Sequence, residues 1–407
     1  MGRQGREAVS RVRKPALVHK PTKQLSEERG IVTMKSRATI WIFALWILFT
    51  SGFLHAQDST TLGEVLVSPT EDSAKNHHAG DKLFGTIVYA KEFEHHDSNL
   101  PAVLDQKTGV QIKRFGSGED VATMSIRGST SEQVQIYLDG SALNKSANGT
   151  VNLAQVPLEL VERIEIYRGA APARFASSSV GGVVNIVTKD AHKKRQTTIT
   201  QAFSSFDTYN GSFLQAVPLK KVQLVFGYEL SHSEGDFTYF DDNGTRFNTN
   251  DDKISTRNNN NFFRHSALVK FKKKYHDNLT FSGSNNFFQE LRGIPGLANL
   301  KSDSATLGTL RNTSNLNLEK NNLFNYPWTV RLQSNFQWNE SSFRDLQSDI
   351  GLGAQDNEDS TYQYGIKLVS ENLLGKNHRF TELLSYSGEH FHPHDRVNPG
   401  SSGPTSY

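Results

Sequence analysis

The chain of 407 residues lacks cysteine altogether. That absence excludes a disulfide scaffold, thiolate zinc sites and cysteine nucleophiles. Long hydrophobic runs are also scarce. The mean hydropathy of −0.53 excludes a polytopic helical membrane protein, which needs several apolar runs of about 20 residues. It does not exclude a transmembrane β-barrel, because only alternate residues of each barrel strand are apolar. The 25 Phe, 12 Tyr and 4 Trp residues favour that class.

Positive charge is also in short supply outside the N-terminal region. The formal net charge is +3, but ten of the 45 Lys and Arg residues and only three acids lie in residues 1–56. The rest of the chain is slightly acidic, with 35 basic and 39 acidic residues. A nucleic-acid-binding surface would depend on those first residues alone, so we exclude that function.

The basic N-terminal region has the features of a targeting segment. Residues 34–56 predict a secretory signal peptide: a basic start, an apolar stretch over 40–49, and a small residue, Ala56, before the expected cleavage site. The alternative is a signal anchor that is never cut. Residues 1–33 show no apolar periodicity and are interpreted as a disordered leader or the product of a misassigned start codon upstream of Met34.

Residues 57–81 follow the expected cleavage site. They contain a short extended-favouring segment and a polar stretch that predicts a linker. The segment consists of Leu62, Gly63, Glu64, Val65, Leu66 and Val67. Such a tethered segment suits strand addition to the sheet edge of a partner. The alternative is an ordinary first strand of the domain that follows.

Residues 82–192 predict a small α/β domain. A helix capped by Ser98 carries Pro101 in its first turn and ends at Gly109. A short helix is expected over 157–162. Strands are expected over 110–112, 124–126, 134–138, 164–167 and 183–187.

Residues 197–407 show the alternation of a transmembrane β-barrel. Apolar residues occupy every second position over 222–230, 267–271, 279–281, 328–332 and 362–368, and again at Phe336 and Trp338. Polar stretches at 272–278 and 372–378 predict short turns, and those at 233–261 and 292–321 predict long loops. A soluble β-sandwich is the alternative, but its outward positions would be polar rather than aromatic. At roughly 10 residues per strand plus connections, this region predicts eight to ten strands.

Four ordered motifs carry a family resemblance. They are Ser125-Ile126-Arg127-Gly128, Tyr137-Leu138-Asp139-Gly140, the run Ile164 to Tyr167 followed by Arg168-Gly169, and Gly181-Gly182 followed by Val183 to Thr188 with Asn185. Together they resemble the plug domain of TonB-dependent outer-membrane receptors. One departure is Phe175-Ala176, where the family commonly has Tyr-Gly. The resemblance implies that Leu62–Val67 is the TonB box, the periplasmic segment that TonB binds.

The resemblance implies a fold and a function. The fold is a small α/β plug domain followed by an antiparallel transmembrane β-barrel of about 22 strands, of which this chain appears to hold only part. We therefore expect a truncated barrel. The implied function is TonB-dependent uptake of cobalamin or an iron–siderophore across the outer membrane, with no catalytic residue. The segment Gly116–Asp120 favours cobalamin. The alternative is a non-transporting surface binding or adhesion protein. Arg127 and Arg168 are expected to form structural ion pairs with the barrel wall.

Two groups of residues are candidates for binding a metal. Asp241, Asp242, Asp251 and Asp252 offer clustered oxygens for calcium in the first long loop, and cobalamin receptors of this family use loop aspartates in that way. The alternative is a solvated acidic loop. His390, His392 and His394 occupy alternate positions, which would suit a transition metal if the strand continues through them.

Overall fold

The computed structural model describes residues 85–406 with short gaps, at 94–98, 116–120, 146–148, 170, 176–178, 193, 246, 276–277, 298–299, 375–377 and 400–404. The expected leader, signal peptide and Leu62–Val67 segment lie outside the described residues. So do Gly116–Asp120 and Ala176. All described residues belong to one compact unit.

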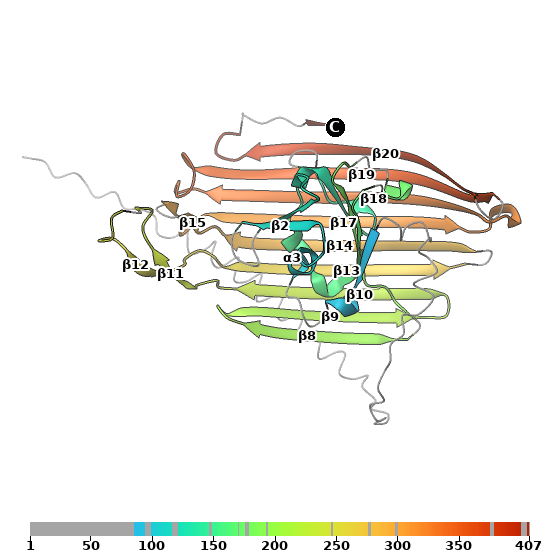
Figure 1. Cartoon of the computed structure of the whole chain (residues 1–407), viewed down its shortest axis with the longest axis horizontal. Coiled ribbons are helices and arrows are strands. Elements are labelled where there is room, and N and C mark those ends of the chain that lie inside the picture. Colours follow the sequence, from blue (N-terminus) through green and yellow to red (C-terminus); the bar gives the residue numbers. More distant parts are fainter. Residues whose placement is uncertain are drawn as a thin grey trace, which may run out of the picture. The chain divides into compact units, whose positions relative to one another are not determined.

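The first part of this unit, which we call the small domain, comprises the described residues of 85–192. Its sheet has the order β1-β6-β7-β4-β5, with β4 and β7 parallel and the other pairs antiparallel (Figure 1). The strands are β1 (Gly85–Tyr89), β4 (Val134–Leu138), β5 (Ser141–Ala142), β6 (Val161–Tyr167) and β7 (Gly182–Thr188). The central strand β7 is apolar on both faces because both are covered, and almost all of its residues are buried.

A single α-helix and a two-stranded hairpin complete the small domain. Helix α3 (Leu100–Asp105) packs Leu100, Val103 and Leu104 into the core, and β2 (Val110–Arg114) pairs with β3 (Ala122–Ile126). The helix cap differs from the prediction. Asn99, not Ser98, caps the helix, because its side chain accepts a hydrogen bond from the Ala102 N–H at 3.0 Å. The helix also ends before Gly109, whose φ of +73° turns the chain into β2.

The prediction of a short helix over 157–162 is wrong for its last residues. A 3₁₀ turn, η6 (Leu158–Leu160), is followed directly by β6, because Val161 already pairs with Thr188 of β7. The other 3₁₀ turns of the described residues are η3 (Ala90–Glu92), η4 (Ser131–Gln133), η5 (Leu153–Gln155), η7 (Ala173–Phe175) and η8 (Leu323–Asn325).

The second part of the unit is a ten-stranded antiparallel sheet, the large sheet (Figure 1). Its order is β21-β20-β19-β18-β17-β14-β13-β10-β9-β8. The strands are β8 (Gln196–Ser204), β9 (Thr208–Pro218), β10 (Val222–Ser233), β13 (Phe262–Lys274), β14 (Leu279–Gly293), β17 (Thr306–Lys320), β18 (Trp328–Asp345), β19 (Gln355–Leu374), β20 (His378–Asp395) and β21 (Thr405–Ser406). The strand count agrees with the expected eight to ten. In the described residues the sheet does not close into a barrel, and it falls short of the strand number expected of a complete one.

The long-loop prediction for 292–321 is wrong, because β17 occupies residues 306–320. Its Asn, Thr and Ser residues have the composition of a loop. However, Leu310, Leu316 and Leu318 fall on one face, and polar residues such as Thr313 and Asn315 fall on the other. Small polar side chains are retained on that second face because it lies toward the small domain, where Asn315 contacts Ser141. The other predicted loop, 233–261, holds a hairpin of β11 (Thr238–Asp241) and β12 (Lys253–Thr256). A minor hairpin, β15 (Gly296–Leu297) with β16 (Leu300–Lys301), lies between β14 and β17.

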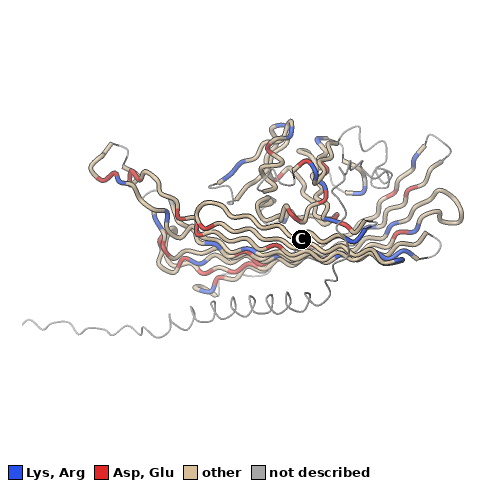
Figure 2. The backbone as a smooth tube through the Cα atoms, turned by 90° about the horizontal axis from the view of Figure 1, so that it is seen from below, with Lys and Arg blue, Asp and Glu red and all other residues tan. Residues whose placement is uncertain are grey.

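The two faces of the large sheet differ in polarity, as the sequence predicts. Leu332, Phe336 and Ile366 lie on the face away from the small domain and are 40–47% exposed, whereas inward-facing Gln337 is 1% exposed. The small domain lies on the inward face of this sheet (Figure 2). The outward apolar face is the kind of surface that meets lipid.

Connections alternate in length between the two ends of the large sheet. The connections from Lys274 to Leu279 and from Leu374 to His378 are short and lie at one end, as predicted. The long connections 234–261, 294–305 and 346–354 lie at the other end. Within the described residues there is no helix with the length and hydrophobicity needed to cross a bilayer.

Candidate functional site

The glycine pair of the fourth motif permits a close approach of three segments. A Cβ on Gly181 would lie 2.6 Å from Ser129 Oγ and 2.8 Å from the Gln133 carbonyl oxygen. Gly182 has φ +131°, and a Cβ there would lie 2.5 Å from the Tyr167 carbonyl oxygen. No other residue fits either position without displacing backbone. The motif therefore fixes where β7 begins against β6.

The second motif makes a left-handed turn that ties β4 to the end of β7. Asp139 has φ +50° and Gly140 has φ +89°. The Asp139 carboxylate accepts hydrogen bonds from the Thr188 N–H at 2.9 Å and from the Thr188 hydroxyl at 2.6 Å. Asp tolerates this backbone region better than most residues, which explains an Asp-Gly pair here.

Glu165 is the centre of a buried polar network that the sequence reasoning missed. It is 1% exposed. Its carboxylate accepts from Arg163 Nε at 2.9 Å, Asn185 Nδ2 at 3.1 Å, Tyr167 Oη at 3.2 Å and Arg174 Nη2 at 3.5 Å. Burial by itself would raise the pKa of Glu165, but Arg163, Asn185 and Arg174 outweigh it and hold that pKa below its usual value. Asn185 of the fourth motif therefore works as a donor to a buried anion.

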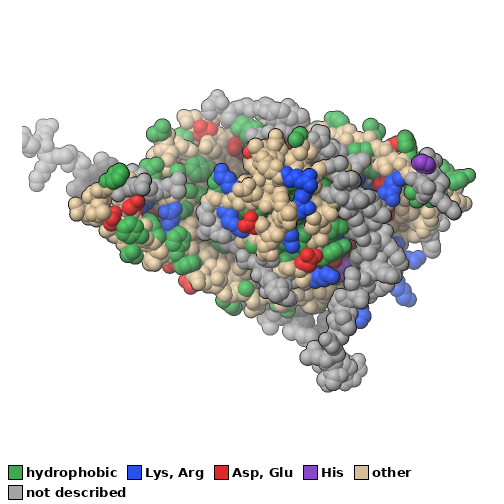
Figure 3. Space-filling view, viewed as in Figure 1, with side chains coloured by type: hydrophobic (Ala, Val, Ile, Leu, Met, Phe, Trp, Pro, Cys, Tyr) green, Lys and Arg blue, Asp and Glu red, His purple; other side chains and the backbone are tan. Residues whose placement is uncertain are grey.

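The two motif arginines lie near each other in the small domain, where several Lys and Arg side chains gather (Figure 3). Arg127 has φ +52°, and Arg168 donates from Nη1 to Thr86 Oγ1 at 2.6 Å. Partial burial and then the charge of Arg127 lower the pKa of Arg168. The expected ion pairs between these arginines and the wall are not formed among the residues that the structure describes. Gly128 and Gly169 leave open space around their Cα atoms.

Long side chains of the large sheet reach main-chain carbonyls of the small domain. Lys270 Nζ donates to the Thr188 carbonyl at 3.0 Å, and Arg311 Nη2 donates to the Gln155 carbonyl at 3.0 Å. Lys367 Nζ lies 3.5 Å from the Gly140 carbonyl oxygen. Three cations on three different strands thus hold the small domain through its backbone. Sequence reasoning could not find these contacts, because carbonyl acceptors leave no trace in the side-chain pattern.

Direct side-chain contacts and one apolar patch add to this interface. Ser141 donates its hydroxyl to Asn315 Oδ1. The apolar patch brings two residues of the small domain against inward-facing residues of β9, β10 and β13. Its members are Leu160, Ala191, Leu214, Ala216, Val225 and Leu268.

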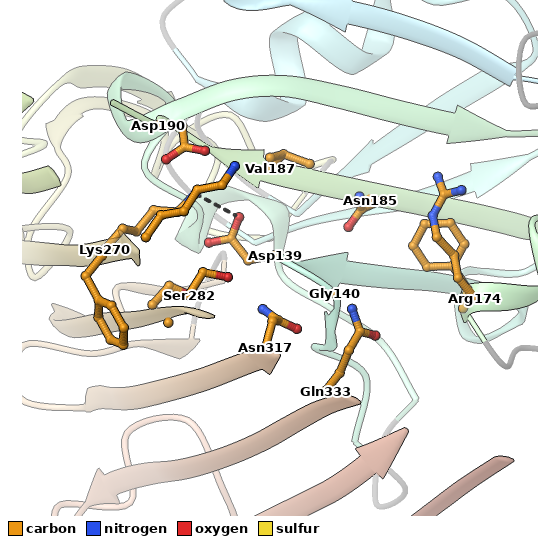
Figure 4. A pocket seen from close by; sticks show the side chains of 15 residues that line it. Asp139, Gly140, Arg174, Asn185, Val187, Asp190, Lys270, Ser282, Asn317 and Gln333 are labelled. Atoms are coloured by element: carbon orange, nitrogen blue, oxygen red, sulfur yellow. Dashed lines mark ion pairs between the residues drawn. The ribbon is translucent and has the colours of Figure 1, made fainter. Parts of the chain in front are cut away.

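A polar cavity of about 260 Å³ lies between the small domain and the large sheet (Figure 4). The small domain contributes Asp139, Asn185 and Asp190 to its lining. The large sheet contributes polar side chains from several strands, among them Lys270, Ser282, Asn317 and Gln333. Lys270 Nζ lies 3.7 Å from Asp139 Oδ1 across the cavity wall. A cavity with this lining favours water over apolar groups, so this part of the seam between the small domain and the large sheet suits water.

The loop aspartates that were predicted to bind calcium already have protein partners. Asp241 forms an ion pair with Lys301 and accepts from Ser255 Oγ at 2.9 Å. Asp251 accepts from Asn243 Nδ2 at 3.2 Å and from Thr245 Oγ1 at 2.9 Å.

The other two aspartates and the histidine row do not add a metal cluster. Asp242 accepts from the Gly244 N–H at 3.1 Å, and Asp252 adds no contact to this group. His390, His392 and His394 share one face of β20, as expected, and two of them contact tyrosine rings of β19. No group of three or more potential metal ligands occurs among the described residues. Calcium binding stays a prediction.

Comparison with known proteins gives a consistent result. Residues 86–183 match the family model of the TonB-dependent receptor plug domain. The vitamin B12 transporter BtuB of Vibrio cholerae serotype O1 is 31% identical over 175 residues, which cover 42% of this chain and 28% of that protein. The match therefore spans well under half of the length of the curated relative.

Solved structures of low sequence identity share the fold. The ferric yersiniabactin uptake receptor FyuA from Yersinia pestis superposes with a TM-score of 0.57 at 16% identity, covering 76% of this chain and 49% of that one. The pyoverdine outer membrane receptor FpvA from Pseudomonas aeruginosa gives a TM-score of 0.58 at 13% identity, covering 76% and 47%.

A small α/β domain is seated on the polar face of a long antiparallel sheet whose opposite face is apolar, and the solved receptor structures share this fold. The motifs, the family model and these relatives then agree on the family. Residues 86–183 match the plug domain of TonB-dependent receptors, and the fold of the described residues is similar to that of the solved outer-membrane receptors.

Proposed function

We propose that this protein takes part in TonB-dependent uptake of a scarce, large nutrient across the outer membrane. Cobalamin or an iron–siderophore is the proposed cargo. The curated relatives are named as vitamin B12 transporters, and the matched structures include receptors for ferric yersiniabactin and pyoverdine. TonB is the proposed periplasmic partner, and it would bind Leu62–Val67.

The observation that carries this proposal is the nature of the interface between the small domain and the large sheet. Its polar contacts include bonds from Lys270, Arg311 and Lys367 to main-chain carbonyls and direct side-chain contacts, and they surround a polar cavity. A hydrogen bond from a charged group of this kind contributes about 1.5–3 kcal/mol, because water can replace either partner when the bond breaks. The core of the small domain is instead a continuous apolar cluster. A pulling force is therefore expected to separate the small domain from the large sheet before it unfolds that core.

The position of β1 gives that force a place to act. Among the described residues, β1 is the edge strand of the small sheet and pairs only with β6. It is also the first described strand after the segment that TonB would bind. Tension applied before Gly85 would act first on five residue pairs of one antiparallel ladder. It would then reach the motif turn at Gly181-Gly182 through β6.

A disulfide between the two parts tests this mechanism. Ser141 and Asn315 hydrogen-bond directly across the seam, and the chain has no native cysteine. Ser141→Cys with Asn315→Cys should therefore form a single cross-link that holds the small domain against the wall. In cells that lack other receptors, uptake of radiolabelled cobalamin or ferric siderophore should stop under oxidising conditions and return after reduction, while surface binding of the cargo persists.

Matched controls distinguish the effect of the cross-link from a general loss of function caused by the cysteine substitutions. Asn285 and Ser314 hydrogen-bond on the outward face of neighbouring wall strands, at 2.9 Å, so a cysteine pair there should leave uptake unchanged. Each single cysteine variant should behave like the wild type. Uptake by the oxidised Ser141/Asn315 variant would show that the seam does not open. Cargo binding without any TonB-dependent uptake by the wild type would favour the surface-binding alternative instead.

A further inference from the structure

The β11–β12 hairpin at the long-loop end of the large sheet has two unlike faces. Cross-strand pairing sets Tyr239 opposite Ser255 and Asp241 opposite Lys253, which puts these four side chains on one face. The other face carries Phe240 and Ile254, which are 64% and 71% exposed. The polar face is therefore the one that is turned toward the rest of the loops.

A pocket of about 310 Å³ lies between that polar face and the loop 294–305. The hairpin side contributes Tyr239, Lys253 and Arg257, and the loop side contributes Lys301, Ser302 and Asp303. This volume is within the range of small-molecule sites. Three cations and one carboxylate line it, so the pocket carries excess positive charge.

The charge of one lysine is compensated and that of two other cations is not. Lys301 forms an ion pair with Asp241, which raises the pKa of Lys301 and lowers that of Asp241. Lys253 and Arg257 make no ion pair with any carboxylate of the described residues. Arg257 is held instead by a hydrogen bond from Nη2 to the Gly296 carbonyl, and its guanidinium lies 5.7 Å from the centre of the Tyr239 ring. These two cations are thus available to an anion.

The loop side of the pocket is fixed by its own hydrogen bonds. Ser302 accepts from the Ala305 N–H at 2.8 Å and donates to Asp349 Oδ2 at 2.9 Å. Asp349 belongs to the next long connection, where the buried Asp345 accepts from its N–H at 2.9 Å. Two loops are therefore tied together behind the pocket, so binding needs little ordering of its wall.

We infer that this pocket binds the anionic group of a small ligand, a carboxylate or phosphate, with a planar part of the ligand against Tyr239. Lys253 and Arg257 supply the charge, and Arg257 presents a fork that matches two oxygens of one anion. The role of this pocket as a place where the cargo first binds rests on the proposed function. A pocket with this charge selects an anionic cargo over a neutral one.

Binding of a defined probe tests this without requiring uptake. The probe is radiolabelled benzene-1,3,5-tricarboxylate, and the matched neutral probe is benzene-1,3,5-tricarboxamide. Both are measured on outer membranes from cells that express the whole chain. The tricarboxylate should bind, the amide should not, and added salt should weaken binding. Lys253→Gln and Arg257→Gln should each weaken tricarboxylate binding about tenfold, the loss expected for one charge-assisted hydrogen bond. Tyr239→Leu should weaken it about threefold.

Matched substitutions at the short-turn end of the sheet serve as controls. Lys221→Gln and Tyr326→Leu remove the same side-chain types from turns far along the chain and should leave binding unchanged. Equal binding of the amide and the carboxylate, or wild-type affinity in both Lys253→Gln and Arg257→Gln, would overturn the inference. Loss of uptake with intact probe binding would instead count against the proposed function and leave the pocket assignment standing.

Discussion

Replacing Glu165 with glutamine removes the charge at the centre of the buried network in the small domain. The variant keeps the volume of the side chain and one acceptor oxygen for Asn185. Arg163 and Arg174 lose their carboxylate partner. Removing one partner of a buried ion pair costs about 3–5 kcal/mol. Both arginine side chains keep about a quarter of their area in solvent, so we expect the lower end, about 3 kcal/mol.

Amide hydrogen exchange across β6 and β7 measures this cost in the whole chain. A loss of about 3 kcal/mol speeds exchange of the most protected amides about 100-fold, since 1.4 kcal/mol is a factor of ten. Glu159→Gln, in the same domain but only partly buried, should change exchange by less than twofold. A change of less than threefold in the Glu165 variant would mean that the arginines find solvent at no cost, and the network would not be structural.

The same carboxylate predicts the direction of a pH effect. Its pKa is held below the usual value in the folded protein, so its contribution is fully present above about pH 4.5. That contribution is lost as the pH falls through the lowered pKa, because protonation then occurs in the folded state as well. After correction for the pH dependence of the intrinsic exchange rate, the protection of wild-type amides should therefore fall below about pH 4, and Glu165→Gln should not show this fall.

Three shorter predictions concern other parts of the chain. Gly182→Ala should destabilise the small domain by about 3 kcal/mol or more, because its Cβ would lie 2.5 Å from a carbonyl oxygen at φ +131°, and faster amide exchange in β6 measures it. Val65→Pro should abolish energised uptake while cargo binding persists, because proline cannot donate to a paired strand; unchanged uptake would place the TonB contact elsewhere. The pKa of His192 is raised because its Nε2 donates a hydrogen bond to the Glu162 carboxylate, so this pair stabilises the fold below about pH 6.5 and loses that effect as the pH rises through the raised pKa. Glu162→Gln should remove this dependence in denaturant titrations.

Several features of the fold could be predicted from the sequence because local chemistry specifies them. Gly181-Gly182 and Asp139-Gly140 are needed for backbone conformations and close approaches that few other residues allow. The alternation over 222–230 predicts β10 because one face meets lipid and the other does not. In each case the reason for the residue lies within a few positions of it.

Glu165 and β17 show why other features were missed. In β6, Arg163, Glu165 and Tyr167 alternate with Ile164 and Ile166, which looks like a half-exposed strand. β6 is in fact covered on both faces, and its polar face meets Asn185 of β7. β17 was taken for a loop because it is rich in Asn, Thr and Ser, and its inward Asn and Thr residues suit turns. Their partners, such as Ser141, are distant in sequence. Contacts of this kind require the fold to be known first.

The sidedness of the large sheet gives a prediction that tests its place in the membrane residue by residue. Leu332 and Ser334 of β18 face outward, and Gln333 between them lines the polar cavity. Because the chain has no cysteine, single variants Leu332→Cys, Gln333→Cys and Ser334→Cys each carry one reporter thiol. In intact outer membranes, a charged methanethiosulfonate reagent should label Gln333→Cys and leave its two neighbours unlabelled. A maleimide confined to lipid should give the opposite pattern.

Labelling by each reagent must alternate with a period of two residues, because successive side chains of a strand point to opposite faces. Neither protein stability nor transport enters the result, so a failure cannot be attributed to a damaged variant. Equal labelling of all three positions by the charged reagent would mean that the apolar face meets water. The outward leucines and aromatics would then need a protein partner rather than lipid, and the outer-membrane placement of this sheet would be wrong.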